Sequence, residues 1–161
     1  MKNIKNIYEA LLNRKGRVCS KDEIVEIIKE YKIKFKSKLD VINTLKYFGR
    51  HKYIKRIFQS YYYINSVDER KREYCSYEDR ELLFTVLNKL KIKWYVGLTS
   101  SLYIHGKFWQ VPRVLHIVNA KFSGTKRILS LKVSFHKIKD SLFFGLKMAE
   151  TKNEIDFYYS D

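Results

Sequence analysis

The sequence predicts an α+β protein made of two domains. Three segments with helical spacing of apolar residues precede two short β-prone segments, all before residue 67, and helical and strand-like segments alternate again after residue 76. Residues 67–76 between them are rich in charged side chains and are expected to form a linker. An apolar fraction of 45% and a single Pro favour packed cores over a disordered chain. We therefore expect domains at residues 1–66 and 77–161.

The first two predicted helices have recognisable boundaries. The first has apolar residues at helical spacing and would end at Gly16; these residues are Ile4, Ile7, Tyr8, Leu11 and Leu12. The second begins at Ser20 and Glu23, whose spacing is that of a capping box, in which each side chain bonds the other residue's backbone N–H. It runs to about Tyr31, with Ile24, Ile27 and Ile28 facing inward.

A third predicted helix starts at a second capping box, Ser37 with Asp40, and ends near Gly49. Its spacing places Val41, Ile42, Leu45 and Phe48 on the buried face, and Asn43, Lys46, Tyr47 and Arg50 on the opposite face. The β-prone segments 53–57 and 61–64 then flank Phe58-Gln59-Ser60 and predict a hairpin. Three helices and a basic hairpin together predict a winged helix-turn-helix.

The second domain is predicted to be a small α+β unit. One helix is indicated by Leu82, Leu83, Val86, Leu87 and Leu90, and a short strand by residues 94–98. Thr99-Ser100-Ser101 would cap a second helix that ends at Gly106, and further strands are expected at 114–120, 128–136 and 155–159.

The positive charge is concentrated in the first domain. The chain carries 33 Lys and Arg against 17 Asp and Glu, a net charge of +16, and residues 1–66 account for a net +10 of it. From Lys32 to Phe58 there are nine basic residues and one acid, Asp40. A positive field centred on the third helix and the hairpin favours double-stranded DNA as the partner.

Side chains in this segment are the candidate DNA contacts. We expect Asn43, Tyr47 and Arg50 to reach base edges, while Lys34, Lys36, Lys38, Lys55 and Arg56 neutralise phosphates. The complete candidate set is Lys36, Lys38, Asn43, Lys46, Tyr47, Arg50, His51, Lys52, Lys55, Arg56 and Gln59. Two alternatives stay open: Asn43 and Tyr47 as ordinary solvent-facing residues, and Tyr61 to Tyr63 as packing rather than stacking groups.

The second domain raises, and then weakens, an enzyme hypothesis. A strand that ends in Gly97 before Thr99-Ser100-Ser101 is how nucleotidyltransferases begin their active site, where backbone N–H groups hold a triphosphate. Such enzymes need paired carboxylates on the next strand to bind magnesium. Residues 114–119 contain no acid, and the four histidines have no metal-ligand spacing. We therefore expect no catalytic residues, no metal and no cofactor.

The compartment is expected to be the cytoplasm. No stretch approaches the roughly 18 apolar residues of a membrane span, and the N-terminal segment lacks the apolar run of a signal peptide. Cys19 and Cys75 form no disulfide framework and are expected to be core residues.

The second domain carries a run that resembles the AbiEi antitoxin family of abortive-infection systems. The resemblance begins at residues 95–106, Tyr-Val-Gly-Leu-Thr-Ser-Ser-Leu-Tyr-Ile-His-Gly, and continues through Gln110-Val111-Pro112, the strand 115–118, residues 133–139 and residues 142–145. Members carry such a run after a winged helix and continue beyond the position of Asp161, so the chain is expected to be a shortened form. From the strand that ends in Gly97 and the Thr-Ser-Ser run after it, the second domain is expected to resemble a degenerate nucleotidyltransferase-like core.

This resemblance implies a promoter-binding repressor and antitoxin. Its DNA partner would be repeats in its own promoter, and its functional partner a nucleotidyltransferase-like toxin that it neutralises without necessarily touching it. A homodimer is expected, because one winged helix covers little DNA. Two other classes stay open: an interaction module that binds nucleic acid loosely, and a nucleotidyltransferase with unconventional metal ligands.

Overall fold

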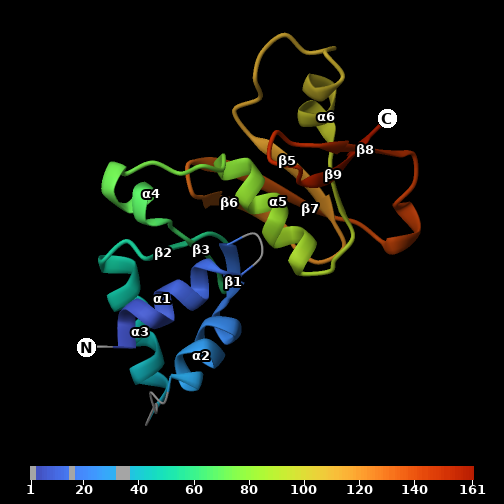
Figure 1. Ribbon diagram of the computed structural model, residues 1–161. Coiled ribbons are helices and arrows are strands. Elements are labelled where there is room, and N and C mark those ends of the chain that lie inside the picture. The colour runs from blue at the N-terminus through green and yellow to red at the C-terminus, as the bar shows by residue number, and fades with distance from the viewer. Residues whose placement is uncertain (1–2, 15–16, 32–36) are drawn as a thin grey trace. The chain divides into compact units, whose positions relative to one another are not determined.

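The computed structural model describes residues 3–14, 17–31 and 37–161, and it divides into two compact units, Met1–Ser76 (unit 1) and Tyr77–Asp161 (unit 2). Helices and strands are mixed along the chain, which confirms the α+β class (Figure 1). Within the described ranges, every helix is too short or too polar to span a lipid bilayer.

Unit 1 combines helices with a small antiparallel sheet. Its elements in chain order are α1 (Asn3–Leu12), β1 (Val18–Ser20), α2 (Lys21–Glu30), α3 (Lys38–Arg50), β2 (Ile54–Arg56), β3 (Tyr61–Ile64) and α4 (Val67–Arg72). The sheet order is β1-β3-β2. Both capping boxes are confirmed at the starts of α2 and α3, and the hairpin turn lies at residues 58–60 as predicted. Gly16, the predicted end of the first helix, lies outside the described residues.

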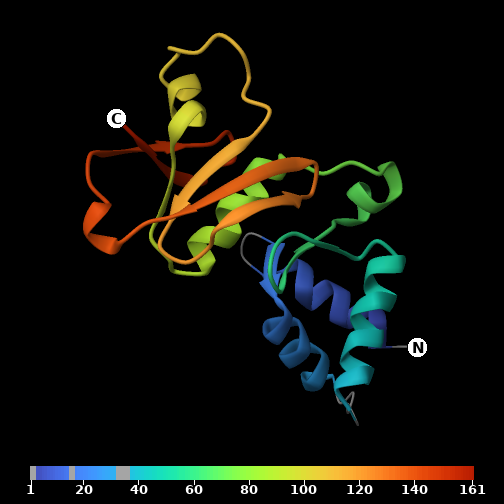
Figure 2. The same ribbon diagram turned by 180° about the vertical axis from the view of Figure 1, so that it is seen from behind.

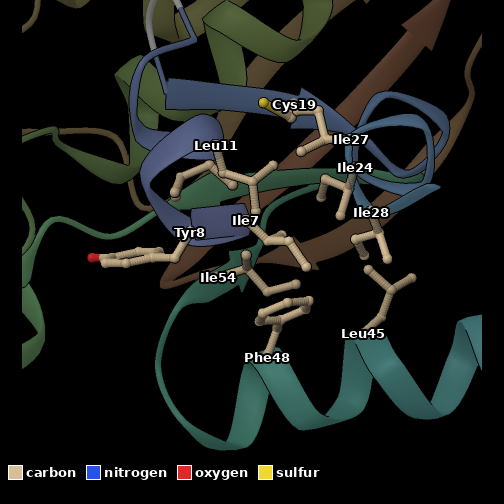
Figure 3. Packing of buried hydrophobic residues seen from close by; sticks show 11 residues of the cluster. Ile7, Tyr8, Leu11, Cys19, Ile24, Ile27, Ile28, Leu45, Phe48 and Ile54 are labelled. Atoms are coloured by element: carbon tan, nitrogen blue, oxygen red, sulfur yellow. The ribbon is translucent and has the colours of Figure 1, made fainter. Parts of the chain in front are cut away.

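The core of unit 1 fixes how α3 is oriented. Figure 3 shows Leu45 and Phe48 pointing from α3 into the cluster that contains Ile7 of α1 and Ile28 of α2. Each such side chain contributes roughly 1.5–3 kcal/mol through burial. Ile24, Ile27 and Ile28 are buried as predicted, as is Cys19. The prediction for Ile42 is wrong: it is 41% exposed, because its position on α3 lies away from Leu45 and Phe48.

Residues 67–76 belong to unit 1 instead of forming the expected linker. Ser66 and Glu69 make a third capping box at the start of α4, and Glu69 is only 2% exposed. Its carboxylate accepts hydrogen bonds from the Tyr63 hydroxyl (2.7 Å), the Arg17 guanidinium (2.7 Å) and the Ser76 amide (2.8 Å). The charged segment 67–76 is therefore attached to unit 1 through the carboxylate of Glu69.

The donors around Glu69 decide its ionisation. Burial by itself would raise the pKa of this carboxyl, but hydrogen bonds from Ser66, Tyr63 and Ser76 outweigh burial and lower the pKa to about 2. Burial and the bond to Glu69 in turn raise the pKa of Tyr63. The buried carboxylate is thus ionised at neutral pH.

Unit 2 is built on one six-stranded sheet. Its elements are α5 (Asp79–Lys89), β4 (Trp94–Val96), α6 (Leu98–Ile104), β5 (Leu115–Asn119), β6 (Gly124–Ile128), β7 (Leu131–Lys137), the 3-10 turn η2 (Asp140–Leu142), β8 (Leu146–Glu150) and β9 (Asp156–Ser160). The strand order is β6-β7-β5-β4-β9-β8, with β5–β7 and β4–β9 parallel. The strand predicted at 128–136 corresponds to β7, which begins later, at Leu131; its hairpin partner β6 and the strand β8 were not predicted.

One face of this sheet is covered by α5. The Phe84 ring of α5 packs 5.0 Å from the rings of Trp94 and Phe157, and Leu82, Leu83, Val86 and Leu87 are buried, as the predicted helix requires. Figure 2 views the sheet from the opposite side, where β5, β6 and β7 lie in front of α5. The β5–β7 part of the sheet therefore has one helix-covered face and one face without a helix.

Thr99, Ser100 and Ser101 do not cap α6 but lie inside it. The helix begins one residue earlier, after Gly97, where a Cβ atom would lie 2.8 Å from the Val118 side chain. The Ser100 hydroxyl donates to the Val114 carbonyl (3.3 Å) and accepts from the His116 amide (3.0 Å). This serine therefore ties α6 to β5.

The Glu69 network predicts an acid-sensitive contribution to stability. The pKa of Glu69 in the folded protein is about 2, below its ordinary value of 4.5. The stability that ionised Glu69 contributes is therefore complete above pH 4.5 and is lost as the pH falls from 4.5 toward 2. Glu69→Gln should lower the free energy of unfolding at pH 7 by about 3 kcal/mol and flatten this pH dependence. Urea unfolding followed by circular dichroism measures both.

The matched control is Asp68→Asn, which removes an exposed carboxylate from the same helix. It should leave both the stability at pH 7 and its acid dependence close to those of the parent chain. Equal effects of the two substitutions would contradict the role given to Glu69.

Candidate nucleic-acid interface

Three polar side chains form an exposed stripe on α3. Asn43, Lys46 and Arg50 recur at helical spacing on the side opposite Leu45 and Phe48, and all three are exposed. Within the described part of the chain, no ion pair or side-chain hydrogen bond engages them. The stripe therefore presents an amide, an ammonium and a guanidinium to solvent from a helix anchored by its opposite face.

Two apolar side chains border this stripe, and sequence reasoning missed both as surface groups. Leu39 is 62% exposed and Ile42 is 41% exposed. The Ser37 capping box was the available signal for Leu39, since it fixes where α3 starts and hence which way residue 39 points. Exposed methyl groups beside amide and guanidinium donors suit contact with thymine methyls in a major groove.

Tyr47 does not belong to the stripe, contrary to the prediction. It is half-buried against the unit 1 core, and its ring lies 6.1 Å from the Phe48 ring and 4.2 Å from the His51 ring. His51 is exposed and ends α3. The Tyr47 ring therefore packs against the core and stabilises the end of α3.

Lys52 is also engaged elsewhere. Its ammonium forms an ion pair with the Glu73 carboxylate, which follows α4. Lys34 and Lys36 lie outside the described residues, as does the side chain of Lys38. The described positive groups of the predicted set that remain near α3 are thus Lys46 and Arg50.

The β2–β3 hairpin carries the other candidates on a short tip. Arg56 is exposed and its guanidinium donates two hydrogen bonds to the Gln59 carbonyl (3.2 and 3.1 Å), which closes the turn. Gln59 is exposed with a φ of 53°, Lys55 is half-buried, and Phe58 is buried. The Lys21 amide donates to the Ser60 carbonyl (2.7 Å), so the tip is fixed to the start of α2.

Unit 2 contains a pocket of about 640 Å³ with apolar walls that include Phe84, Val96 and Phe157. Two of the carboxylates that line it are engaged: Asp79 accepts from the Ser130 amide (2.9 Å), and Glu81 accepts from the Glu78 amide and from Asn153 (2.9 and 2.8 Å). Among the described residues, no group of three or more His, Cys, Asp or Glu could hold a metal ion.

The comparisons with known proteins add no relative. No family model matches this chain, and no curated protein matches its sequence. The resemblance to the AbiEi antitoxins therefore rests on the residues quoted for it.

The exposure of the α3 side chains predicts how substitutions affect folding. Arg50→Ala and Asn43→Ala should each change the free energy of unfolding by less than about 0.5 kcal/mol, since both side chains are exposed. Tyr47→Ala removes packing against the core and should cost about 1–2 kcal/mol. Chemical unfolding of the three variants compares them, and a Tyr47→Ala variant as stable as the parent would place that ring at the surface.

Proposed function

We propose that unit 1 is a winged helix-turn-helix domain that binds double-stranded DNA through α3 and the β2–β3 hairpin. The order of its elements, helix, strand, two helices and a hairpin, supports this assignment, as does a sheet in which β3 lies between β1 and β2. Unit 1 also holds the basic segment from Lys32 to Phe58.

The observation that carries the proposal is the stripe of Asn43, Lys46 and Arg50. Its side chains have no protein partner among the described residues, and Leu45 and Phe48 hold the helix that presents them. Arg and Asn are the side chains that make bidentate bonds to guanine and adenine in the major groove. A basic surface without such Arg and Asn side chains on a helix would bind DNA without distinguishing its base sequence.

In this mechanism α3 enters the major groove and the hairpin contacts the backbone. Arg50 and Asn43 read base edges, Leu39 and Ile42 supply apolar contact, and Lys55 and Arg56 neutralise phosphates. Arg56 acts in a second way, because its bonds to the Gln59 carbonyl keep the turn compact. Two copies on adjacent half-sites would multiply the affinity of one domain.

The biological role we propose is that of a transcriptional repressor and antitoxin that binds its own promoter. This part depends on the resemblance of residues 95–106 and the later segments to AbiEi antitoxins, and it names a nucleotidyltransferase-like toxin as the functional partner. The cytoplasm is the compartment where such a regulator acts.

A second candidate function is supported by unit 2, which could act as a protein-interaction module. Trp109 is 87% exposed and Val111 is 71% exposed, and Val111 lines the apolar pocket. Exposed apolar groups of this size beside a pocket are typical of protein contact sites. Co-purification of a stoichiometric partner that is lost in Trp109→Ala would favour this function for unit 2.

The DNA proposal predicts salt-dependent, sequence-selective binding. A gel shift with the DNA upstream of the protein's own gene should give a complex whose affinity falls steeply with salt, because phosphate contacts release counterions. Scrambled DNA of the same composition should bind more weakly, and equal binding of the two sequences would contradict promoter recognition.

Two substitutions separate base contacts from phosphate contacts. Arg50→Ala should weaken binding to the promoter by about 1–3 kcal/mol and reduce discrimination against scrambled DNA. Lys55→Ala should weaken both complexes alike and reduce the salt slope by about one ion. Lys5→Ala, which removes an exposed charge from α1, is the control and should bind as the parent does. Identical profiles for Arg50→Ala and Lys55→Ala would argue against base reading by α3.

A further inference from the structure

The longest acid-free stretch of the chain lies in unit 2. Residues 82–139 contain no Asp or Glu and eleven basic residues: Lys89, Lys91, Lys93, Lys107, Arg113, Lys121, Lys126, Arg127, Lys132, Lys137 and Lys139. This exceeds the basic segment of unit 1 in both length and number of charges. The chain therefore has a second basic segment, which includes the strands β4 to β7.

The register of the β6–β7 hairpin places two of these charges side by side. Arg127 lies opposite Lys132, and the alternation of strand side chains puts both on the sheet face that α5 does not cover. Both side chains are exposed, and neither has an acidic partner in the described structure. Like charges directly opposite each other on adjacent strands are destabilising, so a bound anion would relieve a repulsion that the protein itself leaves unbalanced.

Ring side chains continue the same face across β7, β5 and β4. His116 and His136 are joined by a hydrogen bond between Nδ1 and Nε2 (3.0 Å), and their ring centroids lie 5.2 Å apart. The register aligns His136 with Val118 and Val118 with Tyr95, so these residues share the face of Arg127 and Lys132. All three rings are half-buried; Val118 between them is buried, and the Tyr95 ring also makes an edge contact with the Phe143 ring (5.7 Å). Each of the three rings therefore has surface left for contact with a ligand.

His116 favours stacking over charge. Burial, and then the neighbouring His136, lower the pKa of His116, so its imidazole is neutral at pH 7. Thr125 and Ser134 add hydroxyl groups on the same face of this hairpin, next to the Arg127–Lys132 pair. The face thus combines guanidinium and ammonium groups, hydroxyls and rings, with no carboxylate on β5, β6 or β7.

We propose that this helix-free face of β5, β6 and β7, with Tyr95 of β4, is a second site that binds single-stranded nucleic acid. Arg127 and Lys132 contact the phosphates, and unstacked bases pack on Tyr95, His116 and His136. Single-strand binding sites combine a positive surface with ring side chains on which bases stack, and sheet faces serve this role. In a duplex the bases are stacked on one another, so no base face would be free to pack on these rings. The site is independent of α3 and of the DNA binding proposed for it.

The test measures binding of labelled single strands of about 12 nucleotides to the full chain by fluorescence anisotropy. Arg127→Glu reverses the anchoring charge and should weaken binding about tenfold or more and lower its salt dependence. The same substitution turns the repulsive pair with Lys132 into an attractive one, so the thermal midpoint should stay level or rise. Loss of binding without loss of stability separates a binding role from a structural one.

The matched control is Lys152→Glu, which makes the same charge change at the turn between β8 and β9, near the opposite edge of the sheet from β6. It should retain most of the affinity. Equal losses for the two variants, or parental binding by Arg127→Glu, would overturn the proposal.

A comparison of ligands and units completes the test. Arg50→Ala in α3 should leave single-strand binding intact, and Arg127→Glu should leave promoter selectivity intact, so failure of one site is distinguishable from failure of the other. RNA and DNA strands of one sequence are compared to identify which carries the preferred sugar. A mixed-sequence duplex that binds as tightly as the single strands, and with the same sensitivity to Arg127→Glu, would refute the stacking role of the rings.

Discussion

The carboxylate of Glu69 is the interaction on which unit 1 depends. It gathers donors from three places in the chain: Arg17 before β1, Tyr63 on β3, and the backbone at Ser66 and Ser76. Burying a carboxylate without hydrogen-bond donors has a large desolvation cost, so Glu69 can be buried only because these four bonds are made. The consequence is that α4 and the residues up to Ser76 are part of the unit, and that the sheet has a fixed connection to the segment before β1.

The core of unit 1 performs a second task by orienting α3. Leu45 and Phe48 pack among Ile7, Ile28 and Ile54, and this packing turns Asn43, Lys46 and Arg50 outward. The DNA contacts proposed for α3 need outer side chains held at a constant position, which requires a rigid inner face. The half-buried Tyr47 extends that inner face at the end of the helix.

The two units carry their positive charge in different chemical settings. On α3 the cations accompany an amide and methyl groups on a convex helix, an arrangement suited to a groove. On the β6–β7 hairpin they lie beside half-buried rings, an arrangement that suits the single strands proposed as its ligand. Net charge alone does not distinguish these settings, because it describes attraction to polyanions and not the geometry of contact.

The sequence by itself determined the α+β class, the helices α1, α2 and α3 with the capping boxes of α2 and α3, and the hairpin turn. These features depend on neighbours within a few residues: Ser20 with Glu23, Ser37 with Asp40, and apolar residues at helical spacing. The sequence also placed Asn43, Lys46 and Arg50 on the exposed side of α3. Local spacing could not tell Ile42 or Tyr47 from their neighbours, because each lies at a border of the buried face.

Only the tertiary structure decided what depends on residues far apart in the chain. The partners of Glu69 lie up to 52 positions away, which is why a charged segment looked like a linker. Strand pairing brought His116 beside His136, 20 positions away, and Gly97, at the start of α6, lies against the Val118 side chain. Register and burial arise from contacts between elements, so no window of sequence contains them.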